Sequence, residues 1–269
     1  MMRNTSLGLF MGLVTSAALA QPITLGISPL RAELKAQPGA ETSQPVRISN
    51  SGEEPVQIRA TISDWTLTPS GETQFVKPGA TSWACAQWLK INPAEFTVEP
   101  GGSQLVRYTM KVPGAAAPGG YHCAILFDTV PPPKEKISGQ TGVVNLIRMV
   151  TTLYTALGDP PIVAKIKRLE IEPQAREKKK SGYDVVTEFG NDGTTHYRVN
   201  GDLEIHDADG RLVKKFEYKS FPVLPGVPRV EVFRLDEPLP AGQYLVRAVV
   251  DVGLKERLAA ETRVTVAGS

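Results

Sequence analysis

The sequence is short of the residues on which metal and enzyme chemistry usually depend. Among its 269 residues are two cysteines and three histidines. It contains no CxxC pair, GxSxG elbow, glycine-rich phosphate loop or paired-carboxylate motif. The histidines, His122, His196 and His206, lack the spacing of metal ligands, and we expect them at exposed strand or turn positions. We therefore predict no catalytic residue, no metal site and no cofactor, which argues against an enzyme.

An excess of either charge is also missing. The chain has 30 lysines and arginines against 28 aspartates and glutamates, a formal net charge of +2, so it lacks the basic field that nucleic-acid binding requires. Its one basic run is Lys178-Lys179-Lys180. Two interpretations of that run stay open: a solvated hairpin tip kept soluble by its charge, or a contact with acidic wall polymers or lipid headgroups.

Long apolar runs are absent after the first twenty residues. Arg3 precedes an apolar stretch that ends in small residues at Ala20, so basic, apolar and small-residue zones follow in secretory order. We predict a signal peptide over residues 1–20, cleaved after Ala20. The most apolar later stretch, Val143 to Leu157, contains Arg148 and several threonines, so the mature chain is predicted not to span a membrane.

The two cysteines are Cys85 and Cys123. An even number of cysteines in an exported chain favours a disulfide. Spacing alone does not prove the pairing, and two buried free thiols are the alternative.

Apolar and polar residues alternate with a period of two along most of the chain. Val46 and Ile48 precede a turn that begins at Asn50, and Val56 and Ile58 follow it. Such strand-length segments, separated by proline and glycine turns, recur throughout and are typical of β-sandwiches. We predict an all-β protein with two immunoglobulin-like sandwiches in tandem, over residues 21–158 and 159–269.

The two halves share two local patterns. Each has an Asn-x-Gly turn, at Asn50 and at Asn191, and each has a proline, a glycine and a tyrosine before a late strand, at Tyr121 and at Tyr244. Tyr121 with Cys123 fits a tyrosine corner, in which the phenol ties a loop to the sandwich. We interpret the likeness as two domains of the same type.

Several segments of the first half resemble, in the same order, the N-terminal domain of PapD-type periplasmic pilus chaperones. They are Leu25-Gly-Ile-Ser-Pro-Leu-Arg-Ala-Glu-Leu34, Val46-Arg-Ile-Ser-Asn50, Trp88-Leu-Lys-Ile-Asn-Pro-Ala-Glu-Phe-Thr-Val-Glu-Pro-Gly101 and the strand from Val143 to about Leu157. The resemblance covers residues 22–160. It implies a periplasmic protein that binds and assembles pilus or surface-fibre subunits without ATP, with an outer-membrane usher as a further partner.

In that family the long last strand of the first domain completes a subunit that lacks a strand. Main-chain hydrogen bonds supply the affinity, and alternating apolar side chains fill a groove. The resemblance implies that Val144, Leu146 and Val150 face the subunit here. A one-residue shift exchanges the two faces, so the face with Ile147 and Met149 is the alternative.

Two basic residues in the family hold the subunit's terminal carboxylate. Arg31 stands where one of these anchors is expected. The other is a lysine in the family, whereas this chain has Thr152, or Thr151, at the matching place. Arg148 is the nearest base, several residues earlier, and we include it among the candidate binding residues.

A second resemblance favours another function. The segment Gly119-Gly120-Tyr121-His122 resembles the β-sandwich domain of WxL-interacting cell-surface proteins, which bind peptidoglycan and other wall components. The alternative function is therefore an envelope or cell-surface binding module that holds wall polymer or a partner protein without chaperone activity.

We expect the mature protein to begin at Gln21 and to lie outside the cytoplasm, because residues 1–20 have the secretory layout. Intact-mass measurement on protein from a periplasmic extract tests this prediction. A mass that still includes Met1 to Ala20 would contradict it.

Overall fold

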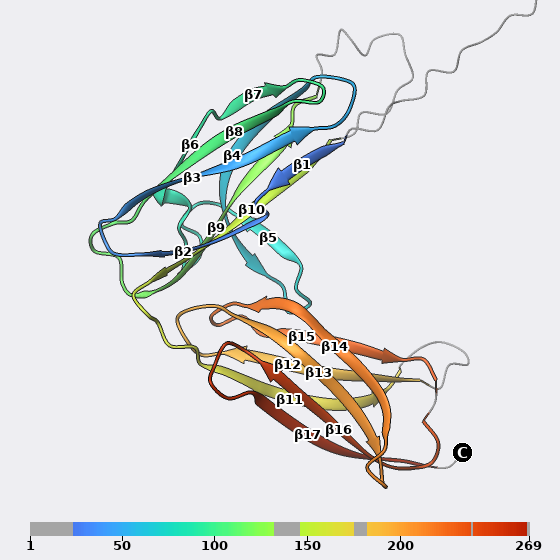
Figure 1. The fold of residues 1–269 in the computed structure, drawn as a ribbon. Helices are drawn as coiled ribbons and strands as arrows, with labels where there is room; N and C mark the ends of the chain where they lie inside the picture. The colour runs from blue at the N-terminus through green and yellow to red at the C-terminus, as the bar shows by residue number, and fades with distance from the viewer. Residues whose placement is uncertain (1–23, 132–145, 175–181, 238, 268–269) are drawn as a thin grey trace, which may run out of the picture.

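A computed structural model describes residues 24–131, 146–174, 182–237 and 239–267. The predicted signal peptide, Val143, Val144 and Lys178 to Lys180 lie outside the described residues. Within the described ranges, no helix is long and apolar enough to cross a membrane. The described chain consists of strands joined by turns, so the predicted all-β class is confirmed (Figure 1).

The first half of the chain forms ten strands, which we call the first sandwich. Its elements are β1 (Leu25–Ser28), β2 (Arg31–Ala36), β3 (Glu41–Asn50), β4 (Val56–Leu67), β5 (Thr73–Val76), the short 3-10 turn η1 (Ala86–Trp88), β6 (Leu89–Asn92), β7 (Glu95–Val98), β8 (Ser103–Lys111), β9 (Gly119–Thr129) and β10 (Arg148–Leu157).

The second half forms seven strands, which we call the second sandwich. They are β11 (Ala164–Pro173), β12 (Tyr183–Asn191), β13 (Tyr197–Asp207), β14 (Leu212–Val223), β15 (Arg229–Leu235), β16 (Gly242–Asp251) and β17 (Leu258–Val266). They form one sheet in the order β11-β12-β15 and another in the order β14-β13-β16-β17. Figure 1 shows the two sandwiches one above the other, joined by the segment between β10 and β11.

The first sandwich has sheets in the orders β1-β3-β8-β6 and β2-β10-β9-β4-β5, and β7 also pairs with β4. The chain changes sheet between β1 and β2. β1 pairs antiparallel with β3 in one sheet, whereas β2 pairs parallel with β10 in the other sheet. As a result β2 lies along only the second part of β10.

Each sandwich has its own apolar core, built by the alternation of strand side chains. In the first, Ile48, Ile58, Tyr108 and Phe127 are at most 1% exposed. In the second, the core includes Phe189, Tyr197, Leu203 and Val246. Two separately packed sandwiches confirm the predicted architecture.

The repeated asparagine turns have the same hydrogen bonds in both sandwiches. The side-chain amide of Asn50 donates to the carbonyl oxygens of Glu54 and Val98, and its Oδ1 accepts from the amide of Gly52. The corresponding bonds of Asn191 reach Thr195, Val223 and Gly193. Each asparagine is buried, so its amide satisfies carbonyl groups that would otherwise lack a partner.

The repeated tyrosines also have the same role. The hydroxyl of Tyr121 donates to the carbonyl oxygen of Ala117 at 2.9 Å, and that of Tyr244 donates to Pro240 at the same distance. Each phenol ties a loop to the strand that follows it. Tyr121 therefore makes the corner that the sequence predicts, and Tyr244 makes its counterpart in the second sandwich.

Cys85 and Cys123 form the predicted disulfide inside the first core, with both residues fully buried. Buried Asp64 holds the loop that carries Cys85, because its carboxylate accepts hydrogen bonds from the backbone amides of Gly79, Cys85 and Ala86. The sulfur bridge and the carboxylate together attach this loop to β4 and β9.

We expect the disulfide to contribute about 4 kcal/mol to the free energy of unfolding, because it closes a loop of 38 residues in the unfolded chain. The replacement of both cysteines by serine should lower the urea midpoint accordingly. Thiol counting on the denatured, non-reduced wild type is the matching control and should find no free thiol. Two reactive thiols would contradict the bridge.

Candidate functional site

One edge of β10 is unpaired over the first half of the strand. β10 pairs with β9 along its whole length, from Arg148 opposite Asp128 to Leu157 opposite Gly119. On its other side β2 begins only at Thr152, which is opposite Arg31. The backbone groups of Arg148 and Val150 point toward this side, because the groups of their neighbours face β9. In the described ranges no strand pairs with this segment, which we call the open edge.

The two faces of β10 have different surroundings. Met149, Leu153 and Leu157 are buried in the first core, so this face covers the protein's own interior. The opposite face carries Leu146 just before the strand, and then Arg148, Val150, Thr152 and Tyr154. Leu146 is 66% exposed, whereas Tyr154 is 4% exposed.

Apolar side chains mark both ends of the open edge. Leu146 lies at its beginning, and Leu30 lies where β2 takes over, since the amide of Thr152 donates to the carbonyl oxygen of Leu30. Leu30 and Leu146 are each 66% exposed, more than any other exposed large apolar residue in the described part of the chain. An unpaired backbone edge flanked by exposed leucines is suited to the addition of another strand.

The charged candidates have different partners. Arg148 makes a two-pronged ion pair with Asp128 on β9, with nitrogen–oxygen distances of 2.6 and 3.0 Å. This pair neutralises Arg148 and turns its guanidinium along the sheet. Arg31 uses its Nε for a weaker contact of 3.2 Å to Glu33. Of the two predicted bases, Arg31 therefore has the more available charge.

A cleft of about 320 Å³ lies at the end of the open edge, between the two sandwiches. Arg31, Thr152 and Tyr154 line it from the first sandwich, and Arg198 and Arg229 line it from the second. Arg229 is paired with Glu231, whereas the guanidinium of Arg198 donates to Ser220. The cleft thus gathers cationic groups from both halves of the chain.

An apolar cluster holds the sandwiches against each other. Trp65, Leu126 and Tyr154, on the outer face of the sheet with β4, β9 and β10, pack against Leu224 of the second sandwich, and Val150 packs at the margin of this cluster. The outer face of this sheet is therefore buried where the second sandwich covers it and exposed at Leu146.

Hydrogen bonds and one close approach accompany this cluster. The amide of Val230 donates to Pro69, in the turn between β4 and β5, and the amide of Gly120 donates to Thr194. Gly71, in the same turn as Pro69, has a φ of +88° and lies directly against the guanidinium of Arg229. The positive φ favours glycine there, and any side chain at this position would also displace that guanidinium.

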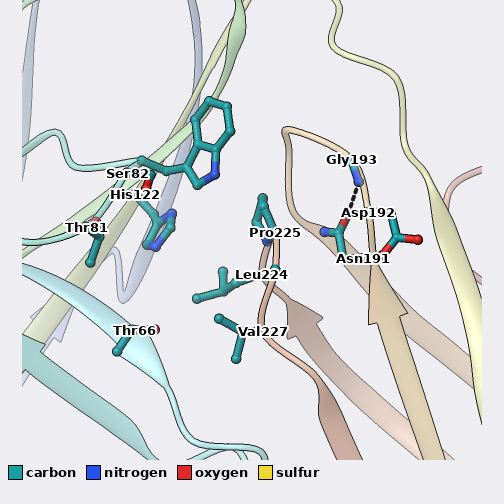
Figure 2. A pocket seen from close by; sticks show the side chains of 12 residues that line it. Thr66, Thr81, Ser82, His122, Asn191, Asp192, Gly193, Leu224, Pro225 and Val227 are labelled. Carbon is teal, nitrogen blue, oxygen red and sulfur yellow. Dashed lines mark hydrogen bonds between the residues drawn. The ribbon is translucent and has the colours of Figure 1, made fainter.

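A second pocket, of about 560 Å³, opens on another side of the contact between the sandwiches. In Figure 2, Thr66, Thr81 and His122 of the first sandwich face Leu224 and Pro225 of the second across the gap.

The expected exposure of the histidines is wrong for His122, which is 4% exposed. It points to the opposite side of β9 from Cys123 and lies against Trp65, with ring centroids 5.1 Å apart. Burial, and to a smaller extent the nearby His196, lower the pKa of His122 to about 4, against the opposing effect of Asp64. His122 is a packed interface residue.

His196 is the second interface histidine. Its ring lies 4.2 Å from that of Tyr154 across the contact between the sandwiches. Burial, followed by the charges of Arg198 and Arg31, lowers the pKa of His196 to about 4. No sequence pattern indicates this contact, because Tyr154 and His196 belong to different sandwiches.

Comparison with protein-family models and with curated proteins returns no match for this chain. Solved structures of fimbrial chaperones do align with it. The class 5 fimbriae chaperone CfaA is 16% identical, with a TM-score of 0.48, over 88% of this chain and 98% of its own.

Two further similar structures are complexes. A chain of the CsuC–CsuE chaperone–tip adhesion subunit complex of Acinetobacter baumannii is 12% identical, with a TM-score of 0.48, over 88% of this chain and 97% of its own. A chain of the Salmonella enterica SafA pilin complex with the SafB chaperone is 12% identical, with a TM-score of 0.45, over 92% and 99%.

We expect the protein to lose stability between pH 6.5 and pH 4. The unfolded chain protonates its histidines near the ordinary value of 6.5, whereas folded His122 and His196 protonate near 4. The unfolded state therefore binds more protons in this window, and the free energy of unfolding falls by about 2 kcal/mol per histidine at pH 5.

Urea unfolding of the wild type at pH 7 and pH 5 measures this loss. The variant His196→Gln should show about half of the wild-type pH dependence. An unchanged pH dependence in that variant would show that His196 does not protonate at a lowered pKa.

Proposed function

We propose that this protein binds pilus or surface-fibre subunits in the periplasm and assists their assembly by β-strand donation, without ATP. The partner inserts beside β10, pairs with the open edge through main-chain hydrogen bonds and covers Leu146. The energy for this step is the stabilisation of a subunit that lacks a strand, so no nucleotide site is needed.

The open edge of β10 is the observation that carries the proposal. A sheet edge with unpaired backbone groups and exposed leucines is a liability in isolation, because it invites pairing with other chains. The protein retains such an edge between Leu146 and Thr151. The face of β10 that carries Met149 and Leu153 is committed to the core, which supports contact of the opposite face with the partner, at Leu146 and at the partly buried Val150.

The position of β2 limits the partner strand. Because β2 occupies the edge of β10 from Thr152 onward, a docked strand must end or turn away beside Leu30 and Arg31. The positive charge of Arg31 favours a chain end that carries a carboxylate. A strand that runs parallel to β10 presents its carboxyl terminus at this point.

An envelope-binding module without chaperone activity is the second candidate. It is favoured by Thr152, a neutral residue opposite Arg31 where the resemblance implies a second base. Retention on isolated cell-wall sacculi, undiminished by substitutions at the open edge, would support this alternative.

We expect Leu146→Asp to leave the protein folded but without its subunit partner, since Leu146 is exposed. Met149→Asp should instead unfold the first sandwich, because Met149 is 8% exposed and packs in its core. Leu212→Asp is the matched control, since Leu212 is 53% exposed in the second sandwich.

Circular dichroism measures folding in this experiment. Affinity purification from the native envelope, with mass spectrometry of the bound proteins, measures partner binding. The proposal expects pilus or surface-fibre subunits with the wild type and Leu212→Asp but not with Leu146→Asp. Retention of the same subunits by folded Leu146→Asp would rule out strand donation.

A further inference from the structure

The cleft at the end of the open edge contains two arginines from different sandwiches. Arg31 begins β2, and Arg198 lies on β13, yet both line the same cavity of about 320 Å³. The hydroxyl-bearing residues Thr152 and Tyr154 line it as well. Guanidinium and hydroxyl donors around one cavity suit a carboxylate, which only accepts hydrogen bonds.

Arg198 is held in place by neutral groups. Its Nε and Nη2 donate to the side-chain and carbonyl oxygens of Ser220, both at 2.9 Å. No carboxylate of the described residues lies within 4 Å of its guanidinium nitrogens. Arg31 contacts Glu33 through Nε, which leaves the terminal nitrogens of its guanidinium for another acceptor.

The two cations act on each other. Burial and the positive charge of Arg31 lower the pKa of Arg198, while Tyr154 and Glu33 oppose this effect. The same two arginines contribute to the lowered pKa of His196. Like charges that face each other in a partly desolvated cleft are unfavourable, and a bound anion would remove this repulsion.

We propose that Arg198 is the second cation of the carboxylate site, and that Arg31 and Arg198 together hold the terminal carboxylate of the strand docked on β10. This inference rests on the proposed function. The second sandwich supplies the charge that Thr152 does not. A bound partner therefore contacts both sandwiches and holds them in one arrangement.

The site selects a chain end rather than an internal segment. A strand on the open edge reaches Leu30, where β2 blocks its path. A chain that ends there places its carboxylate at the mouth of the cleft that Arg31 and Arg198 line. An internal segment brings no charge and leaves the repulsion between the two guanidinium groups in place.

The test uses a soluble, fluorescently labelled peptide of alternating valine and threonine, long enough to cover the open edge from Leu146 to Thr151. One form ends in a free carboxylate and the other in an amide. Fluorescence anisotropy measures the affinity of each form for the intact protein. We expect the acid to bind the wild type about tenfold more tightly than the amide, as charge-assisted hydrogen bonds imply.

Arg198→Ala and Arg31→Ala should each remove most of this preference, and Arg198→Lys should keep part of it. Arg211→Ala is the matched control. It removes an exposed positive charge of the second sandwich in the turn between β13 and β14, and it should keep the full preference. Thermal denaturation confirms that each variant is folded.

The outcomes separate the two proposals. If the wild type binds acid and amide equally, and Leu146→Asp abolishes both, strand docking stands and the carboxylate site is wrong. If the acid is preferred but Arg198→Ala keeps the whole preference, Arg198 is not part of the site. If the wild type binds neither form, the open edge does not accept a strand, and both proposals fail.

Discussion

The arrangement of the functional surface depends on the apolar cluster around Trp65. The sheet that contains β4, β9 and β10 is apolar on both faces, so one sandwich alone cannot bury it. Trp65, Leu126 and Tyr154 find their cover in Leu224 of the second sandwich. Trp65 is further fixed by the hydrogen bond from its indole nitrogen to the carbonyl oxygen of Cys123. This contact brings the second sandwich beside β10 and forms the cleft.

The same burial divides β10 into two functional parts. Its second half is paired on both edges, and Tyr154 of this half is buried in the cluster. Its beginning is paired on one edge only, and Leu146 remains exposed. The second sandwich is therefore more than a spacer. It sets where the exposed part ends, and it places Arg198 where the unpaired backbone gives way to β2.

Charge and packing both shape the place where the open edge ends and β2 begins. Arg31, Arg198 and His196 lie near one another. Burial, followed by the charges of the two arginines, lowers the pKa of His196, and burial, followed by the charge of Arg31, lowers the pKa of Arg198. Burial keeps His196 neutral at neutral pH, so the cleft then carries only the arginine charges. Arg148, although closer to the exposed part of β10, is neutralised by Asp128. The usable positive charge is thus concentrated at the end of the open edge.

Local chemistry made much of the fold predictable. The period of two specified strands, and the turn residues divided them into two sandwiches. Asn50, Asn191, Tyr121 and Tyr244 form their structures with groups a few residues away or on the same sandwich, so short patterns were sufficient to locate them. The other decisive features join residues far apart in the chain. Sequence alternation reveals two faces of β10 but not which one meets the core, and it placed His122 at the surface. The pairing of Arg148 with Asp128 depends on strand register, and the approach of Arg198 to Arg31 depends on how two sandwiches pack, which only the tertiary structure decided.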